Sequence, residues 1–268
     1  MDTNAYRIAP GTRPSLAQLP TAGGEGMQKA EGRTMLRELH RELQELQQTL
    51  YASRTHAVLI VLQAMDAAGK DSTIRRCFGP LNPQGCRVVT FRQPTDVELR
   101  HDFLWRIHKQ APQHGEIGIF NRSHYESILV ERVKELTPLS RVEPRYDHIN
   151  NFERMLTDEK TVIVKFYLHV SKQYQRQRFE RRLRRDDKRW KFNPTDLDDR
   201  ASWKQYMEAY EWAFARCSTE YAPWYVVPAE RRWFRDVVIT QVVVESLRRL
   251  DLDWPQPPYD PSTVHIPA

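Results

Sequence analysis

The chain has few cysteines and no long apolar run, and each shortage excludes a class of protein. Its three cysteines, Cys77, Cys86 and Cys217, show no CxxC spacing among 268 residues, so we expect reduced thiols rather than a disulfide framework. No apolar run approaches the roughly 18 residues that a membrane helix needs. The N-terminus lacks the basic and apolar regions of a signal peptide. A soluble protein of the cytoplasm is therefore expected.

Positive charge is concentrated in one stretch, residues 172–191, which we call the basic segment. The net charge of the chain is +6, and the basic segment holds ten Lys/Arg against three acids. Its excess of +7 exceeds the charge of the whole chain, so the remaining residues sum to −1. Such a segment either faces a polyanion or forms a solvated basic surface.

Length and composition predict one large α/β domain or two small ones. Residues 1–26 are rich in Pro, Gly and Thr. This composition predicts an N-terminal arm that is either mobile or packed on a surface. Residues 27–253 predict the main domain, and the Pro-rich residues 254–268 predict a C-terminal tail.

Apolar and helical stretches alternate along the main domain. Strands are predicted at residues 57–62, 86–91, 116–120, 161–168 and 224–227. Helices are predicted at residues 27–51, 96–110, 123–135, 146–156, 198–217 and 234–250. This alternation indicates βαβ crossovers, hence a three-layer α/β fold with a mainly parallel sheet and helices on both faces. Five leucines at steps of three and four in residues 36–50 indicate a helix packed on the domain or on a neighbouring subunit; a coiled coil is the alternative.

The first predicted strand leads into a loop that is typical of phosphate binding. Ala64 and the Gly69-Lys70 pair have the spacing of a Walker A motif, with a helix expected from Asp71. Backbone N–H groups of such a loop bind phosphate, and Lys70 adds a point charge. The match is imperfect, because Ala64 replaces the usual Gly and Asp71 replaces the usual Ser or Thr.

Phosphoryl transfer also needs a metal and cations around the phosphates. Asp66 is the candidate metal ligand, with a capping role for its carboxylate as the alternative. Asp71 could cap the helix or hold water around the metal, and Ser72 and Thr73 are further hydroxyl candidates. Ala67, Ala68, Gly69 and Arg75 complete the expected phosphate-binding set.

The third strand ends in Asn121-Arg122, followed by His124 and Glu126. Asn121 stands where many P-loop enzymes place a Walker B acid, and it is a poor replacement for a carboxylate on Mg²⁺. Arg122 would point into the same crevice and could bind a phosphate with two hydrogen bonds, although a surface salt bridge is the alternative. His124 is expected to be structural.

Arginines of the basic segment would form one stripe if a single helix ran through it. They are Arg178, Arg182, Arg185 and Arg189. Phe179 and Leu183 could attach that helix to the body. The stripe could bind nucleic acid, close over transferred phosphates as a lid, or remain solvated. The aromatic residues that follow are expected in the core and interfaces, with base stacking as the alternative. They are Trp190, Trp203, Tyr206, Tyr210, Trp212 and Phe214.

Five motifs together resemble the polyphosphate kinase 2 family, over about residues 27–250. They are QAMDAAGKDST, LNPQG at 81–85, GIFNRSHYES at 118–127, RWKFNPTDLDDR at 189–200 and STEYAPWYVVPA at 218–229. The resemblance implies a thymidylate-kinase-like P-loop fold with a helical lid at about residues 172–197. It also implies Mg²⁺-dependent, reversible phosphoryl transfer between inorganic polyphosphate and a nucleotide, with Mn²⁺ as an alternative metal.

The resemblance also implies roles for single residues. Asp66 is similar to the family's metal-binding acid, Lys70 to its loop lysine, and Arg122 to the arginine after the Walker B position. Arg178 and Arg182 resemble the lid arginines. The pair Asn121 and Glu126 resembles the subgroup that accepts both AMP and ADP.

The expected partners are polyphosphate, AMP, ADP, ATP and guanine nucleotides, within a homodimer or homotetramer and without nucleic acid or membrane. Two other functions stay open. One is an ATP-dependent nucleoside monophosphate kinase of similar fold. The other is a P-loop protein that binds nucleic acid without catalysis.

Overall fold

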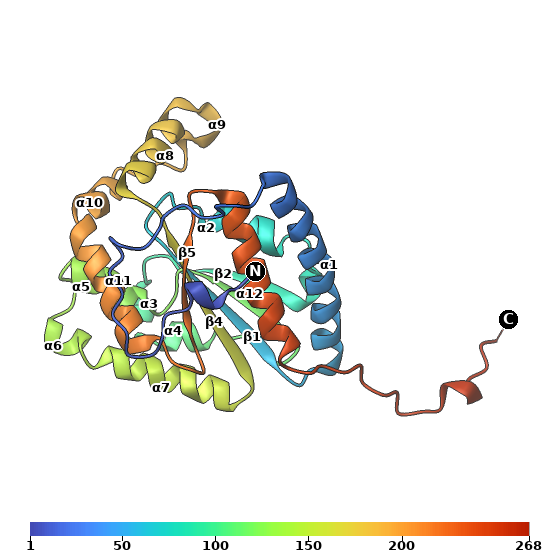
Figure 1. The fold of residues 1–268 in the computed structure, drawn as a ribbon. Coiled ribbons are helices and arrows are strands. Elements are labelled where there is room, and N and C mark those ends of the chain that lie inside the picture. The colour runs from blue at the N-terminus through green and yellow to red at the C-terminus, as the bar shows by residue number, and fades with distance from the viewer. Residues whose placement is uncertain (268) are drawn as a thin grey trace.

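A central sheet of five parallel strands organises the chain (Figure 1). The structure is a computed structural model that describes residues 1–267. The strand order is β2-β3-β1-β4-β5. The strands are β1 (Ala57–Gln63), β2 (Cys86–Thr90), β3 (Ile117–Asn121), β4 (Thr161–His169) and β5 (Trp224–Pro228). All five positions predicted from apolar runs are confirmed within a few residues. Strands β1, β3, β4 and β5 are buried almost throughout, whereas the edge strand β2 is only partly covered.

Register brings the polar ends of two strands together. Leu62 of β1 lies opposite Asn121 of β3, so the phosphate loop that follows β1 emerges beside the segment that follows β3. On the other side of β1, Val61 lies opposite Lys165 of β4. Parallel strands end at the same edge of a sheet, and ligands bind beyond that edge.

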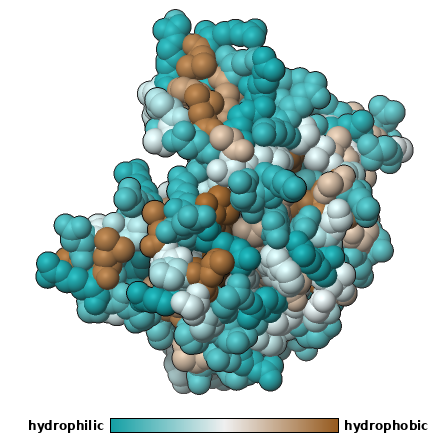
Figure 2. All heavy atoms as spheres, turned by 90° about the vertical axis from the view of Figure 1, so that its left-hand side faces the viewer, coloured by the Kyte–Doolittle hydropathy of each residue, from teal (hydrophilic) through white to brown (hydrophobic). Residues whose placement is uncertain are grey.

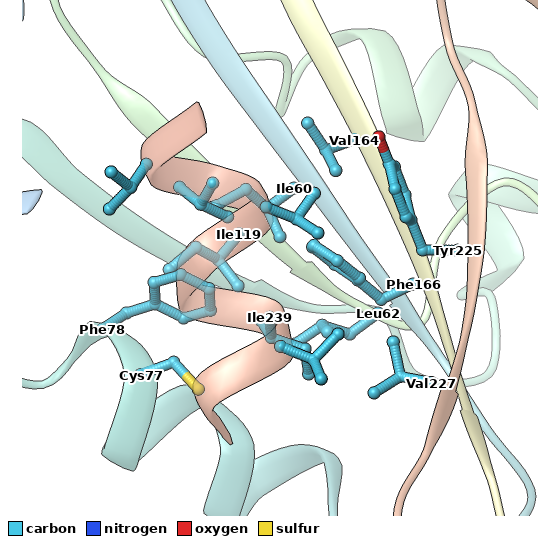
Figure 3. Close-up of a cluster of buried hydrophobic side chains, with 14 of the residues drawn as sticks. Ile60, Leu62, Cys77, Phe78, Ile119, Val164, Phe166, Tyr225, Val227 and Ile239 are labelled. Atoms are coloured by element: carbon cyan, nitrogen blue, oxygen red, sulfur yellow. The ribbon is translucent and has the colours of Figure 1, made fainter. Parts of the chain in front are cut away.

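One face of the sheet is covered by α1 (Lys29–Ser53) and α12 (Arg232–Arg248). Figure 3 shows side chains such as Ile60, Phe166 and Val227 directed from the strands toward α12. Leu36, Leu39, Leu43 and Leu50 of α1 are buried in this same cluster. The leucine pattern therefore packs α1 on its own domain.

The opposite face is covered by α5 (Glu126–Val133), α7 (Arg145–Asp158) and α11 (Trp203–Cys217), with the short α6 (Leu139–Val142) between the first two. Tyr206, Tyr210 and Phe214 of α11 are buried here, as expected for core aromatics. The two helical layers around the sheet confirm the predicted three-layer α/β architecture.

The helix predicted at 96–110 is wrong, since two short helices occupy this range. They are α3 (Asp96–Leu99) and α4 (Trp105–His108). Asp102 lies between them, and its Oδ1 accepts hydrogen bonds from the N–H groups of Leu104 and Trp105 at 2.9 and 3.0 Å. An Asp side chain that accepts hydrogen bonds from the backbone N–H groups two and three residues later favours a turn over a continuous helix. The helix expected from Ser123 likewise begins only at Glu126.

The basic segment does not form one continuous helix, so the predicted four-arginine stripe is wrong. Helix α8 (Lys172–Arg184) ends where Arg185 adopts an extended backbone with ψ 118°, and α9 (Asp186–Arg189) starts anew. Phe179 is buried, with its ring centroid 5.9 Å from that of Phe192 in the same basic part of the chain, whereas Leu183 is exposed. Trp190 is also exposed, against the expectation of a core residue.

Helices α8 and α9 stand out from the body and lead into α10 (Asp196–Ala201) (Figure 1). Figure 2 shows apolar side chains on the surface of this projecting part.

At the N-terminus, Ile8 and Leu16 are buried, so the arm lies on the body. The tail extends away from it (Figure 1). None of the helices within residues 1–267 is long and apolar enough to cross a membrane.

Short helical turns complete the chain. They are η1 (Asn4–Tyr6), α2 (Lys70–Thr73), the π-helical η2 (Ile74–Phe78), η3 (Pro83–Gly85) and η4 (Pro261–Thr263).

Candidate active site

The phosphate loop follows β1 and ends where α2 begins at Lys70. Gly69 has φ +114°, which L side chains rarely adopt, and a Cβ there would lie 2.7 Å from Nη1 of Arg235. Gly69 is therefore required both for its backbone angle and for the space above Arg235. The hydroxyls of Ser72 and Thr73 donate to the carbonyl of Gly69 at 2.8 and 3.2 Å, so in this structure both close the first turn of α2.

Lys70 turns back over the loop, where its Nζ donates to the carbonyl of Ala64 at 2.9 Å. Burial, and then the positive charge of Arg122, lowers the pKa of Lys70. A lysine held this way lacks a full counter-charge. An anion in the loop would supply that charge.

Asp66, Arg122 and Glu126 form a group at the mouth of the loop. Nη2 of Arg122 donates to Oδ1 of Asp66 at 3.0 Å, and Nη1 lies 3.6 Å from Oε2 of Glu126. Glu126, and then Asp66, raises the pKa of Arg122, which stays charged. Arg122 has φ +63°, a left-handed angle that is uncommon for a side chain of this size.

Asp71 links three parts of the site. Its Oδ1 accepts a hydrogen bond from Nδ2 of Asn121 at 3.1 Å, and its Oδ2 lies 3.1 Å from Nζ of Lys191 in the basic segment. Burial alone would raise the pKa of Asp71, but the hydrogen bond and the charge of Lys191 lower it. Asp71 therefore ties the start of α2 to the end of β3 and to the basic segment.

Helix α8 contacts the loop through a residue that the sequence analysis did not single out. Nε2 of Gln175 donates to the backbone carbonyl of Asp66 at 3.0 Å. Nη1 of Arg182 lies 3.6 Å from Oδ2 of Asp196. Burial, and then the charge of Asp66, raises the pKa of Asp196 to about 6. Burial, and then the nearby Arg232, lowers the pKa of Arg178.

Of the predicted site residues, the structure gathers Ala64, Asp66, Arg122 and Glu126 in one cleft. The sequence did not point to the other polar residues that line the cleft, which are Asp199, Tyr206 and Tyr210. The acids of the DLDD stretch were the available signal. The predicted Ala67 and Ala68 are buried in the loop, with Ala67 at φ +65°. Arg75 is exposed on η2, and Arg178 and Arg182 are not among the residues that line the cleft.

Arg235 was also missed, and it lies directly under the loop. Its side chain is 1% exposed, and Nη2 lies 2.6 Å from Oδ1 of Asp236 and 3.4 Å from Oγ of Ser72. Asp236 also pairs with Arg76 at 2.5 Å. Two arginines against one carboxylate leave a net positive charge beneath the loop, which favours an anion there.

The donor set of the site fits a magnesium ion. Mg²⁺ is commonly held by one or two carboxylates together with phosphate oxygens and water. Asp66 presents such a carboxylate at the cleft. Within residues 1–267, no three His, Cys, Asp or Glu side chains gather as a metal-binding group. The arrangement thus suits a metal that is bound largely through phosphates, and not a metal enclosed by protein ligands.

Comparison with known proteins decides the family. The model of the family described as Polyphosphate kinase 2 (PPK2) matches residues 26–253. The chain belongs to the polyphosphate kinase 2 family. The match spans the whole of the predicted main domain and confirms the family that the five motifs indicate.

Two relatives and one solved structure are similar to this chain along almost its whole length. An AMP/ADP-polyphosphate phosphotransferase of Meiothermus ruber is 51% identical, over 94% of this chain and 95% of the relative. An ADP-polyphosphate phosphotransferase of Rhodopseudomonas palustris is 41% identical, over 95% and 92%. The crystal structure of polyphosphate kinase 2 from Arthrobacter aurescens superposes with a TM-score of 0.92 at 40% identity, covering 96% of this chain and 93% of that one. The α/β P-loop kinase fold is thereby confirmed.

Proposed function

We propose that this member of the polyphosphate kinase 2 family transfers a phosphoryl group between inorganic polyphosphate and adenine nucleotides, AMP as well as ADP, with Mg²⁺ as the metal. The observation that carries the proposal is the convergence of Lys70, Arg122 and the basic segment on one phosphate loop whose mouth holds Asp66. Only cations can bring two polyanions together, and such electrostatic stabilisation is the main contribution a protein makes to phosphoryl transfer.

Each residue has a defined task in this reaction. The backbone of Ala67, Ala68 and Gly69 binds the phosphates of the donor, and Lys70 leaves the carbonyl of Ala64 to neutralise them. Asp66 would hold Mg²⁺, which supplies charge neutralisation on the phosphate oxygens when it is bound. Arg122 lies between Asp66 and Glu126 and binds the transferred phosphoryl group.

The basic segment acts as a lid in this proposal. Arg178 and Arg182 close over the donor from α8, whose base already contacts Asp66 through Gln175. Loop and lid closure excludes water, so the phosphoryl group passes to the nucleotide and is not hydrolysed. Burial and the nearby charge of Arg232 lower the pKa of Arg178, so the charged form of this side chain is less favourable than in water. The negative charge of a bound polyanion would offset this effect.

The acceptor range is proposed from Asn121 and Glu126. Glu126 lines the cleft beside Asp66, and its carboxylate repels a longer phosphate tail more than a short one. The relative from Meiothermus ruber carries AMP and ADP in its name. We expect this chain to accept both, and guanine nucleotides as further acceptors.

Three further expectations belong to this proposal. The protein works in the cytoplasm, residues 27–253 form the catalytic domain, and the assembly is a homodimer or homotetramer. Light scattering after gel filtration measures the last of these directly. Nucleic acid is not expected to bind at the lid, and a filter-binding assay that compares RNA with polyphosphate checks this.

The activity test uses purified protein, ADP and long-chain polyphosphate, with ATP resolved by chromatography over time. ATP should form with Mg²⁺ and should not form in EDTA. A parallel reaction with AMP, and with ATP as the only phosphoryl donor, tests the monophosphate kinase alternative. Turnover with ATP and AMP but not with polyphosphate would reject the proposal.

A further inference from the structure

Four polar side chains form a fully enclosed network behind the active site. They are His124, Tyr125, Glu153 and Lys165, each at most 2% exposed, and we call them the Glu153 network. Oε1 of Glu153 accepts hydrogen bonds from Nε2 of His124 at 3.1 Å and from the hydroxyl of Tyr125 at 2.9 Å. Nζ of Lys165 donates to Oε2 of Glu153 at 2.5 Å, to the Tyr125 hydroxyl at 2.8 Å and to the carbonyl of Cys217 at 2.7 Å.

Burying this network removes two charged side chains from water, which costs free energy that apolar side chains would not. Lys165 interrupts the apolar β4, and its neighbours along the strand, Val164 and Phe166, are buried. A buried ion pair is often no more stabilising than apolar side chains of similar volume, because both charges lose their hydration. Folding alone therefore does not explain why these charges are present.

The network holds the segment that carries Arg122 and Glu126. His124 and Tyr125 lie between these two residues in the chain, and both side chains end on the same oxygen of Glu153. On the other side, the N–H of Arg122 donates to the carbonyl of Leu62 at 3.1 Å. The segment is thus fixed at both ends, to β1 in front and to α7 behind.

Arg122 needs this restraint because its backbone is strained. A left-handed angle costs an ordinary residue about 1–2 kcal/mol, and Arg122 has φ +63°. Strained backbone persists only where the surroundings over-determine it. Without the attachment at Glu153, the segment could relax and carry the guanidinium of Arg122 away from Asp66.

We propose that Glu153 is a positioning residue that fixes Arg122 in the geometry required for phosphoryl transfer. The inference rests on the role proposed above for Arg122. It adds that the acceptor oxygen of Glu153, rather than its charge, is the part that catalysis needs.

Two double variants separate the oxygen from the charge. Both remove the buried ion pair, and only one keeps an acceptor for His124 and Tyr125. Glu153→Gln with Lys165→Met keeps the amide oxygen, and we expect kcat within about threefold of the parent. Glu153→Leu with Lys165→Met removes it, and we expect kcat to fall by about tenfold or more, a barrier change of about 1.4 kcal/mol. The KM for polyphosphate should change little in either.

A matched control and a background variant complete the test. Tyr146→Phe changes a buried tyrosine of α7 whose hydroxyl has no hydrogen-bond partner within residues 1–267, and it should leave kcat unchanged. In an Arg122→Ala background, Glu153→Leu with Lys165→Met should lower the residual kcat by less than twofold, because residues that act through one another are not additive. Full additivity would overturn the proposal.

If either double variant fails to fold, Tyr125→Phe gives the same test with a smaller change. It should lower kcat in the parent and have no effect in the Arg122→Ala background. Equal kcat for the Leu and Gln double variants overturns the positioning role, while a low kcat of Arg122→Ala leaves the proposed function intact. Full turnover of Arg122→Ala would instead overturn both the role of Arg122 and this inference.

Discussion

Replacing Asp66 by Asn separates catalysis from stability at the centre of the site. The change removes one negative charge and keeps the shape of the side chain. Asp66 lies 3.0 Å from Arg122, with side-chain exposures of 19% and 39%. Arg122 retains Glu126 as a second partner at 3.6 Å, so no buried charge is left without a counter-charge.

The two expected magnitudes differ in kind. Ion pairs that water reaches contribute about 0–1 kcal/mol to folding, so the free energy of unfolding should fall by less than about 1 kcal/mol. Loss of one preorganised electrostatic contact in an active site costs about a hundredfold in rate, or about 2.7 kcal/mol. Turnover should therefore fall far more than stability.

The assay measures ATP formation from ADP and polyphosphate across a Mg²⁺ series, with urea unfolding of both proteins in parallel. If Asp66 holds the metal, the Asn variant should also need more Mg²⁺ for half-maximal rate. Glu208→Gln on the surface of α11 is a control of the same chemical type. Near-normal turnover of Asp66→Asn would refute the reasoning and leave Asp66 as a turn-capping residue.

Four other predictions follow from the geometry. Changing both Arg178 and Arg182 to Glu should raise the KM for polyphosphate and flatten its dependence on salt, since fewer counterions are released; an unchanged slope would return these side chains to a solvated surface. Glu126→Asn should reduce kcat/KM for AMP far more than for ADP, and equal losses would make Glu126 only a helix-start acid. Gly69→Ala should reduce turnover by about tenfold or more, because a Cβ would meet Arg235 at 2.7 Å and a φ of +114° is strained; a fully active variant would contradict this. The pKa of Asp196 is raised from 3.8 to about 6, so the folded protein keeps a proton between pH 4 and 6 that the unfolded chain releases, and this carboxyl lowers stability as pH rises. The urea midpoint of Asp196→Asn, measured relative to that of the parent protein, should therefore rise between pH 4 and 7. A difference between the two midpoints that does not change with pH would contradict the raised pKa of Asp196.

The sheet could be predicted from the sequence because strands buried on both faces are near-continuous apolar runs. Residues 57–62 and 161–168 are of this kind, and the structure places both within a residue or two. The break between α3 and α4 could not be predicted, since it depends on whether the Asp102 side chain bonds to the backbone of the next turn or faces water. A side-chain hydrogen bond decides between the two, and the spacing of apolar residues in the sequence carries no information about it.

Within the site, spacing predicted the loop residues, and the strand end predicted Asn121 and Arg122. Spacing could not predict partners that are distant in the chain. Arg235 reaches Gly69 from a helix more than 160 residues later. Lys165 finds Glu153 only when α7 packs on β4. A lysine inside the apolar run TVIVKFYL was the one visible signal of that pair.

In the proposed reaction, polyphosphate is the donor and both AMP and ADP are acceptors. The most direct measurement starts with AMP, polyphosphate and Mg²⁺, without ATP, and follows the three adenine nucleotides over time. ADP should appear first and then decline as ATP accumulates, and EDTA should stop both steps. A mixture in which AMP remains unchanged, while ADP added in its place yields ATP, would contradict the dual-acceptor claim. No ATP from either nucleotide would contradict the whole account.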